Sequence, residues 1–267
     1  MSSSAPSGAS PRRSPRQPLC GAVSGAAAAV CVGVDDYRAH APALAGCVGD
    51  AAALARVLGG PFAFPQVRLL LNGDATRAAV VEAVRAMADM ARGGLLTQAF
   101  FSFAGHGAQV PDSPGGSEDD GRDEGLLCAD GQLLRDDDLL DLLCLFPPTC
   151  SVTVVVDACH SGSVGDLPHV LWGRAPPPAR APLAPVTLLA ACADASTAAE
   201  AWSVARGAPA GALTEALLVI LREQAYTVTC GVLLVRLRER LAGLQVPHLS
   251  ASTRLAASTL WSDVRGF

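Results

Sequence analysis

The sequence predicts an α/β fold, a sandwich in which a largely parallel central sheet carries helices on both faces. The first observation is that several short apolar runs, among them 27–34, 99–103 and 151–156, lack the polar alternation of a half-exposed strand. Such continuous runs are typical of strands buried on both faces. The second is that helical patterns separate these runs, which indicates crossover connections. With 267 residues, half of them apolar, the chain can also bury a substantial core.

Turn-forming residues set the limits of the first elements. The first strand stops at Asp35 and Asp36, and the Gly-Gly-Pro sequence at 59–61 closes the helix that follows. Thr76 is a suitable N-cap because its hydroxyl can accept a hydrogen bond from a backbone N–H of the first turn. The expected elements are a strand at 27–34, a helix at 47–58, a strand at 66–71 and a helix from 76 to about 92.

The rest of the chain continues this alternation after one long interruption. The stretch 111–124 is rich in proline, glycine and acidic residues, and it is expected to be a loop. The expected elements are a strand at 99–103, a helix at 136–145, strands at 151–156 and 186–191, and helices near 214–223 and 229–241.

Two segments are expected to lie outside the packed core. Residues 1–19 are rich in Ser, Pro and Arg and predict a disordered tail. Because an apolar run follows this basic segment, the layout is also compatible with an organelle transit peptide, whereas the cytoplasm is the default location. Residues 173–185, "GRAPPPARAPLAP", predict a proline-rich linker.

Charge and cysteine content argue against several classes of protein. A formal net charge of −5 and a pI of about 5.5 disfavour nucleic acid or an anionic membrane as a partner. No apolar run reaches the roughly 18 residues that a membrane-spanning helix requires. The nine cysteines include no Cys-x-x-Cys pair, so neither a zinc site nor a disulfide framework is indicated.

A histidine and a cysteine follow two of the buried strands. His106 comes after the strand 99–103, and Cys159 comes after the strand 151–156. Because parallel strands end at one edge of a sheet, the two side chains are expected to meet there as base and nucleophile. Glycines flank His106, and the N–H groups of Gly107 and Cys159 are candidates to stabilise an oxyanion. Each residue alone would more often be structural, so the prediction rests on their coincidence.

A phosphatase loop is the main competing interpretation of the segment "CHSGSVG". Such a loop requires an arginine that holds the phosphate with two hydrogen bonds. No arginine occurs between Cys159 and Arg174, so this interpretation is rejected.

These residues lie within a longer pattern that resembles the metacaspases, cysteine peptidases with the caspase fold. The resemblance is carried by "GVDDY", "LAGCVGDA", "FAGHGAQ", "SEDDGRDEG", "RDDDL", "VVDACHSGSVGDLP", "AACADASTAAEA", "GALTEALLVIL" and "LQVPHLSAS", in this order over roughly 28–252. It implies a caspase-like three-layer sandwich with a large-subunit-like region at 20–172 and a small-subunit-like region at 186–267. The short linker is similar to the type I arrangement, and a monomer is the family expectation.

The resemblance implies that His106 and Cys159 form the catalytic dyad and that Asp50 and Asp157 line the primary specificity pocket. Two carboxylates in a partly buried pocket repel one another, and a bound cation relieves both. The expected substrates are therefore peptides and proteins with Arg, and secondarily Lys, before the scissile bond. This pair opposes specificity for Asp or Asn. A purely structural role for Asp157, as a turn cap, is the alternative.

The resemblance also implies that calcium stimulates the activity. The aspartates that match the ligands of calcium-activated metacaspases are Asp123, Asp136, Asp137 and Asp166. Hard oxygen ligands from several loops suit Ca²⁺, and binding would order the loop beside the nucleophile. Because the preceding loop carries extra residues, Asp119 or Asp120 are alternatives to Asp123.

Self-cleavage is expected after Arg174 and Arg180, which lie in the proline-rich linker without a proline directly after them. The sequence also departs from the family pattern. Ala104 stands where a serine is usual, Gly49 where an asparagine is usual, and "DASTAAE" at 194–200 where "DxQTSAD" is usual. These changes remove hydrogen-bonding groups near the cleft, so a calcium-binding regulatory or scaffold protein with little peptidase activity is the second hypothesis.

Overall fold

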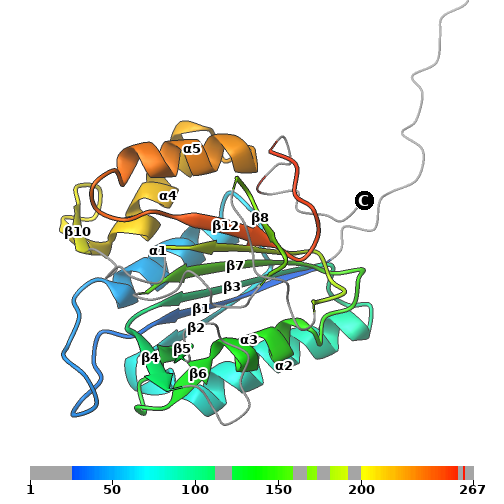
Figure 1. Ribbon diagram of the computed structural model, residues 1–267, viewed down its shortest axis with the longest axis horizontal. Helices are drawn as coiled ribbons and strands as arrows, with labels where there is room; N and C mark the ends of the chain where they lie inside the picture. Colours follow the sequence, from blue (N-terminus) through cyan, green and yellow to red (C-terminus); the bar gives the residue numbers. More distant parts are fainter. Residues whose placement is uncertain are drawn as a thin grey trace, which may run out of the picture.

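The computed structural model describes residues 26–111, 122–158, 167–172, 181–191, 200–257 and 261, leaving aside the side chains of 110, 111, 122, 123 and 200. A seven-stranded sheet with the order β2-β1-β3-β7-β9-β12-β8 forms the middle layer (Figure 1). These strands are β1 (Ala27–Gly33), β2 (Gln66–Leu71), β3 (Gln98–Ala104), β7 (Ser151–Asp157), β8 (His169–Val170), β9 (Val186–Ala190) and β12 (His248–Ala251). The five strands from β2 to β9 are parallel, and β12 and β8 add an antiparallel edge.

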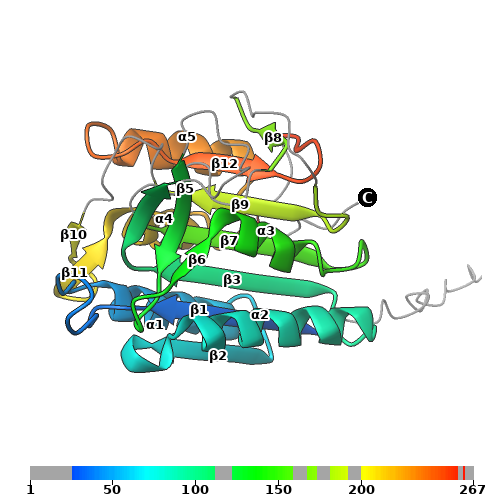
Figure 2. The ribbon, with the colours of Figure 1, turned by 60° about the horizontal axis from the view of Figure 1, so that its bottom comes forward.

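Helices cover both faces of this sheet. In Figures 1 and 2, α1, α4 and α5 lie on one side, and α2 and α3 lie on the other. Their bounds are α1 (Cys47–Gly59), α2 (Arg77–Arg92), α3 (Asp136–Leu143), α4 (Ala212–Glu223) and α5 (Cys230–Arg240). The predicted α/β sandwich is therefore confirmed. None of the helices in the described part of the chain is both long and apolar enough to span a membrane.

The core consists of two apolar layers, one on each face of the sheet. In β1, Val30 and Val32 belong to the cluster that includes residues of α2 and α3. Ala29 and Cys31, which point the other way, belong to the cluster that includes residues of α1, α4 and α5. All seven residues of β1 are buried, which explains why its sequence shows no polar alternation.

Helix α2 starts at a local cap, whereas the start of α1 depends on a residue distant in the sequence. Thr76 caps α2 by accepting a 3.2 Å hydrogen bond from the N–H of Ala79. Helix α1 has no side-chain cap of its own at Gly46. Instead, the carboxylate of Asp35 accepts hydrogen bonds from the N–H groups of Cys47 and Val48, at 2.8 and 3.2 Å. The acidic residue two positions beyond β1 thus fixes the start of α1.

Several short strands were not predicted. A separate antiparallel sheet contains β4 (Gly107–Pro111), β5 (Arg122–Leu127) and β6 (Leu133–Arg135), and a hairpin contains β10 (Glu200–Ser203) and β11 (Ala208–Gly211). The loop expected at 111–124 is therefore wrong at both ends, because residue 111 belongs to β4 and residues 122–124 belong to β5. Pairing with β4 and β6 outweighs the low strand propensity of this sequence.

Two predicted segments fall outside the described residues. These are the tail at 1–19 and the first part of the linker, 173–180. The end of the linker, at 181–185, leads directly into β9, and Ala184 in it is buried.

Candidate active site

The register between β3 and β7 aligns the ends of the two strands. Ala104 pairs with Asp157, and the N–H of Gly105 donates a 3.3 Å hydrogen bond to the carbonyl of Asp157. His106 is two residues beyond Ala104, and Cys159 is two residues beyond Asp157. Neighbouring strands lie about 5 Å apart, so this register places the carboxyl ends of β3 and β7 side by side. Cys159 itself lies outside the described residues.

His106 is held by two contacts that sequence reasoning did not identify. Its backbone N–H donates a 2.8 Å hydrogen bond to the hydroxyl of Tyr37, and the two rings are 4.9 Å apart. Its Nε2 lies 2.8 Å from the carbonyl oxygen of Pro42. Because a carbonyl only accepts hydrogen bonds, Nε2 carries a proton in this contact, and in the neutral ring Nδ1 is then the basic nitrogen.

The two glycines beside His106 have different roles. A side chain at Gly105 would collide with the hydroxyl of Tyr37 and the ring of Phe103. The close approach that requires glycine at position 105 therefore comes from side chains of the protein itself. Gly107 pairs with Leu126, next to a hydrogen bond from the N–H of Leu127 to the carbonyl of His106. Antiparallel ladders alternate, so the N–H of Gly107 points away from β5.

Asp50 and Asp157 are brought together although they are far apart in the sequence. Asp50 is fully buried in the first turn of α1, and Asp157, at the end of β7, is buried as well. Oδ2 of Asp50 accepts a 2.7 Å hydrogen bond from the N–H of Gly211. Oδ2 of Asp157 accepts hydrogen bonds from the N–H and hydroxyl of Thr214, at 2.9 and 2.8 Å. A side chain at Gly211 would overlap both carboxylates, so glycine is required between them.

Burial is the main electrostatic feature of this pair. Loss of solvation, followed by repulsion from Asp157, raises the pKa of Asp50 to about 7. Loss of solvation also raises the pKa of Asp157, and its hydrogen bonds with Thr214 act in the opposite direction. Both carboxyl groups therefore resist ionisation. A cation placed beside them would stabilise their ionised forms.

Two charged residues that the sequence analysis did not single out complete this cluster. Arg206 lies in the turn between β10 and β11, and its Nη2 is 2.6 Å from Oδ1 of Asp50. The same nitrogen is 3.4 Å from Oε2 of Glu215, in the first turn of α4. Thr214 and Gly211 occur in the quoted segment "GALTEALLVIL", but no local signal marks Arg206.

Comparison with known proteins assigns the family. The profile described as "Caspase domain" matches residues 26–257, which is most of the chain. The chain belongs to the caspase domain family. The predicted relation to the metacaspases is confirmed by similar proteins that carry this name.

The similar proteins include metacaspases from fungi and plants. Metacaspase-1 of Cryptococcus neoformans is 32% identical over 154 residues, covering 53% of this chain and 33% of that protein. Metacaspase-4 of Arabidopsis thaliana is 32% identical over 146 residues, covering 52% and 34%. The matched region thus spans about a third of these relatives. Protein GSU0716 of Geobacter sulfurreducens, a solved structure, has a TM-score of 0.66 and 25% identity, covering 90% of this chain and 98% of that one.

Six cysteines of the caspase domain are described, and all are free thiols. Burial raises the pKa of each one; for example, it raises the pKa of Cys31 to about 11 and that of Cys128 to about 12. These thiols stay protonated at neutral pH and are poor nucleophiles. The candidates for a reactive cysteine are therefore the three outside the described residues, Cys20, Cys159 and Cys192.

The aspartates predicted to bind calcium are only partly described. Asp136 is buried at the start of α3, and its two oxygens accept hydrogen bonds from the N–H groups of Asp137 and Glu124, at 2.7 and 3.4 Å. Asp137 is exposed beside it. Asp166 and the side chain of Asp123 lie outside the described residues, and the remaining residues hold no cluster of three metal-ligating side chains.

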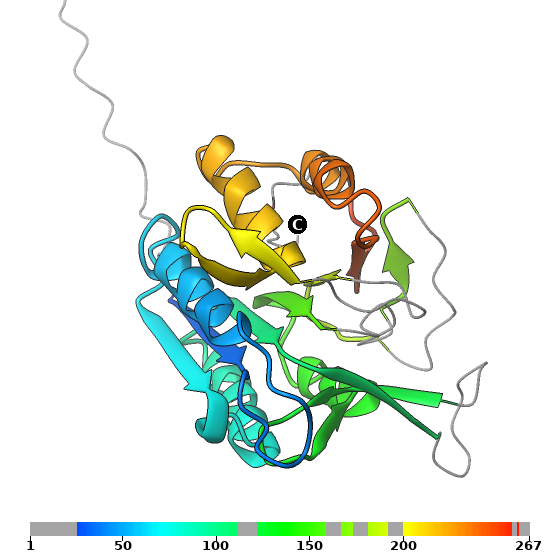
Figure 3. The same ribbon diagram turned by 90° about the vertical axis from the view of Figure 1, so that its left-hand side faces the viewer.

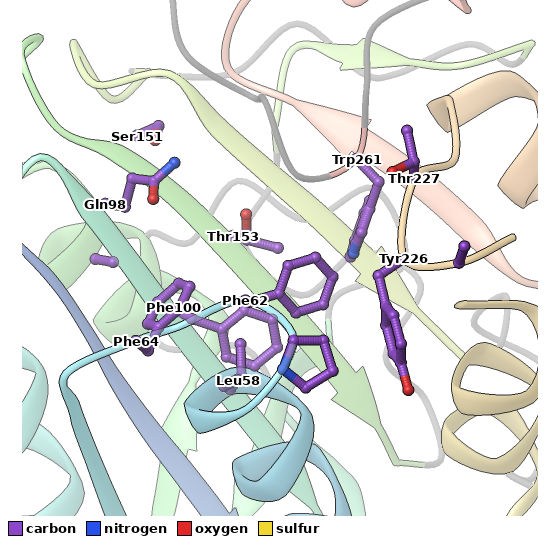
Figure 4. Close-up of a pocket in the computed structure, with 13 residues that line it drawn as sticks. Leu58, Phe62, Phe64, Gln98, Phe100, Ser151, Thr153, Tyr226, Thr227 and Trp261 are labelled. Carbon is purple, nitrogen blue, oxygen red and sulfur yellow. The ribbon is translucent and has the colours of Figure 1, made fainter. Parts of the chain in front are cut away.

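A cavity of about 570 Å³ lies at the amino ends of the central strands, opposite the candidate active site. It is lined at one side by Gln98 and Ser151, the first residues of β3 and β7. Figure 4 shows the rings of Phe62, Tyr226 and Trp261 gathered around it. It contains none of the predicted site residues, so it is separate from the candidate active site.

Proposed function

We propose that the chain is a cysteine endopeptidase that cleaves after Arg, and secondarily after Lys, through the dyad Cys159 and His106. The observation that carries this proposal is the buried pair Asp50 and Asp157 beside the strand ends that bear the dyad. Because two desolvated carboxylates gain most from a cationic partner, they favour a guanidinium or ammonium group in the substrate.

The residues have complementary roles in peptide cleavage. The thiolate of Cys159 attacks the carbonyl carbon of the scissile bond, and the N–H groups of Gly107 and Cys159 stabilise the oxyanion. His106 gives a proton to the leaving amine, which departs and leaves a thioester. Water then attacks the thioester and gives up a proton to His106, which releases the acid and restores the thiolate and the protonated histidine. The contact of Nε2 with Pro42 supports Nδ1 as the nitrogen that exchanges this proton.

We further propose that calcium binding stimulates the enzyme. The residues that would hold the ion are Asp123, Asp136, Asp137 and Asp166. The oxygen donors of Asp136 and Asp137 fit Ca²⁺, because carboxylate oxygens are the ligands that this hard cation prefers. The bound ion would supply positive charge that holds these acidic segments together beside the segment containing Cys159.

Self-processing is the last part of the proposal. Arg174 and Arg180 are the candidate cleavage positions because each provides the basic residue that the acidic pair favours. Intact mass spectrometry after calcium addition, with an Arg174→Gln and Arg180→Gln double variant as the control, tests this step. An active wild-type chain that keeps its full mass would contradict it.

The decisive experiment is hydrolysis of fluorogenic peptides ending in Arg, Lys or Asp, with millimolar calcium or with a chelator. We expect calcium-dependent cleavage after Arg, weaker cleavage after Lys and none after Asp. Cys159→Ala and His106→Ala are expected to abolish it. No turnover by a folded chain that binds calcium would instead support the regulatory or scaffold protein.

A further inference from the structure

The turn between β10 and β11 inserts an arginine of the chain itself into the acidic cluster. Figure 3 shows this hairpin, in yellow, beside α1 and α4. The side chain of Arg206 is only 16% exposed, although Val204 in the same turn is 88% exposed. The N–H of Arg206 donates a 3.2 Å hydrogen bond to the hydroxyl of Ser203, which keeps the turn tight. The guanidinium is therefore directed inward from an otherwise solvent-exposed turn.

The contacts of Arg206 use only part of its hydrogen-bonding capacity. Nη2 contacts Asp50 at 2.6 Å and Glu215 at 3.4 Å. Its Nε and Nη1 are buried and have no hydrogen-bond partner among the described residues. A buried N–H group without a partner costs free energy, so the contacts of Arg206 with the described residues do not form an optimised ion pair.

The carboxylates are anchored independently of Arg206. Oδ2 of Asp50 is held by the N–H of Gly211, and Oδ2 of Asp157 is held by Thr214. If Arg206 leaves, both side chains keep these hydrogen bonds and their orientation. Oδ1 of Asp50, which Arg206 now occupies, then becomes available to a second guanidinium.

Gly49 provides the space that Arg206 needs. A Cβ atom at this position would lie 3.2 Å from Nη1 of Arg206, a tight contact. A larger side chain at position 49 would therefore crowd the guanidinium.

We propose that Arg206 is a resident cation of the specificity pocket, which the substrate's arginine must displace from Asp50. This inference rests on the proposed function, because it concerns the same acidic pair. Arg206 then sets specificity: only a side chain that replaces its charge at Asp50 compensates for its removal. If Arg206 occupies the pocket about nine-tenths of the time, the apparent affinity for substrate falls about tenfold.

The test compares peptide hydrolysis by Arg206→Gln, Gly49→Asn and the wild type. We expect Arg206→Gln to lower KM for Arg peptides about tenfold and to change kcat less than about twofold, because only a competing group is removed. Gly49→Asn, which pushes Arg206 outward, is expected to lower KM in the same direction. Arg222→Gln, at an exposed arginine of α4, is the matched control and should leave KM unchanged.

A binding experiment separates this inference from the proposed function. Ethylguanidine, which carries the arginine head group without a peptide bond, is titrated calorimetrically into Cys159→Ala with and without Arg206→Gln. Binding about tenfold tighter without Arg206 supports the resident cation even if no variant cleaves any peptide. Unchanged or higher KM, together with no gain in ethylguanidine binding, would overturn it. If Arg206→Gln fails to fold by circular dichroism, the same two readouts on Gly49→Asn decide.

Discussion

The two ends of the central sheet differ in the kind of side chain that they gather, charged at one end and aromatic at the other. At the carboxyl ends of β3 and β7, the fold buries Asp50, Asp157 and most of Arg206 within one cluster. At the amino ends of the same strands, it leaves an aromatic cavity of about 570 Å³. Burying a charge destabilises the folded state, whereas burying aromatic rings stabilises it. The comparison indicates that the carboxyl end bears the charged cluster proposed to bind substrate, whereas the amino end contributes stability.

The largest expected effect is at the amino end, where a substitution of Phe100 should change stability without changing activity. Phe100→Ala is expected to lower the free energy of unfolding by roughly 3 kcal/mol, because a buried ring is replaced by a larger cavity. The kcat/KM of the remaining folded protein should be unchanged. Urea denaturation and peptide hydrolysis measure the two quantities. Phe64→Ala, at a half-buried ring of the same cavity, should destabilise less. Lost activity in folded Phe100→Ala would contradict the division between the two ends.

The reverse result is expected at the carboxyl end. Asp157→Asn should lower kcat/KM for Arg peptides at least about 100-fold, because a buried charge partner of the substrate is removed. The free energy of unfolding should stay constant or rise, since a desolvated carboxylate disappears. Asp89→Asn, at an exposed acid of α2, serves as the control. A strong loss of stability with intact kcat/KM would show that Asp157 is structural.

The pH dependence of stability is expected to reveal the raised pKa of Asp50. In the unfolded chain its carboxyl loses the proton near the ordinary value, whereas in the fold the pKa is about 7. Between these pH values the folded state holds one proton more, so the free energy of unfolding falls as pH rises. The slope from this group is roughly 1 kcal/mol per pH unit and ends above about pH 7. Chemical denaturation of the wild type and Asp50→Asn across this range measures it. Equal slopes in the two proteins would rule out a raised pKa.

The smallest expected effect concerns the hydroxyl of Thr214. Thr214→Val removes one of the two hydrogen bonds to Oδ2 of Asp157, which raises the pKa of Asp157 further and costs about 1 kcal/mol of stability. The pH profile of kcat/KM for Arg peptides should therefore shift to higher pH. Thr214→Ser keeps the hydroxyl and should retain the wild-type profile. A shift in both variants would point to packing instead of hydrogen bonding.

Local patterns sufficed for the main elements of the fold. The capping residue Thr76 and the apolar runs at 27–34 and 151–156 predicted α2, β1 and β7 to within about one residue. The small sheet of β4 to β6 could not be predicted in the same way. Its strands contain glycine, proline and charged residues, and they are formed by pairing between segments that local propensity does not describe.

The candidate site was predictable where it depends on strand ends. His106 and Asp157 follow buried runs, and Asp50 was found through the resemblance to a known pattern. The arginine that contacts Asp50 was not found, because 156 positions separate the two residues and only the hairpin turn brings them together.

The sequence by itself therefore determined the α/β class, the strand ends that carry the candidate dyad, and the family. These features depend on burial patterns and short motifs, which are properties of contiguous residues. Only the tertiary structure decided that Asp50 and Asp157 share a buried cluster, and that Arg206 and Glu215 complete it. Electrostatic interactions depend on distance in space and on loss of solvation, and neither quantity exists until the chain is folded.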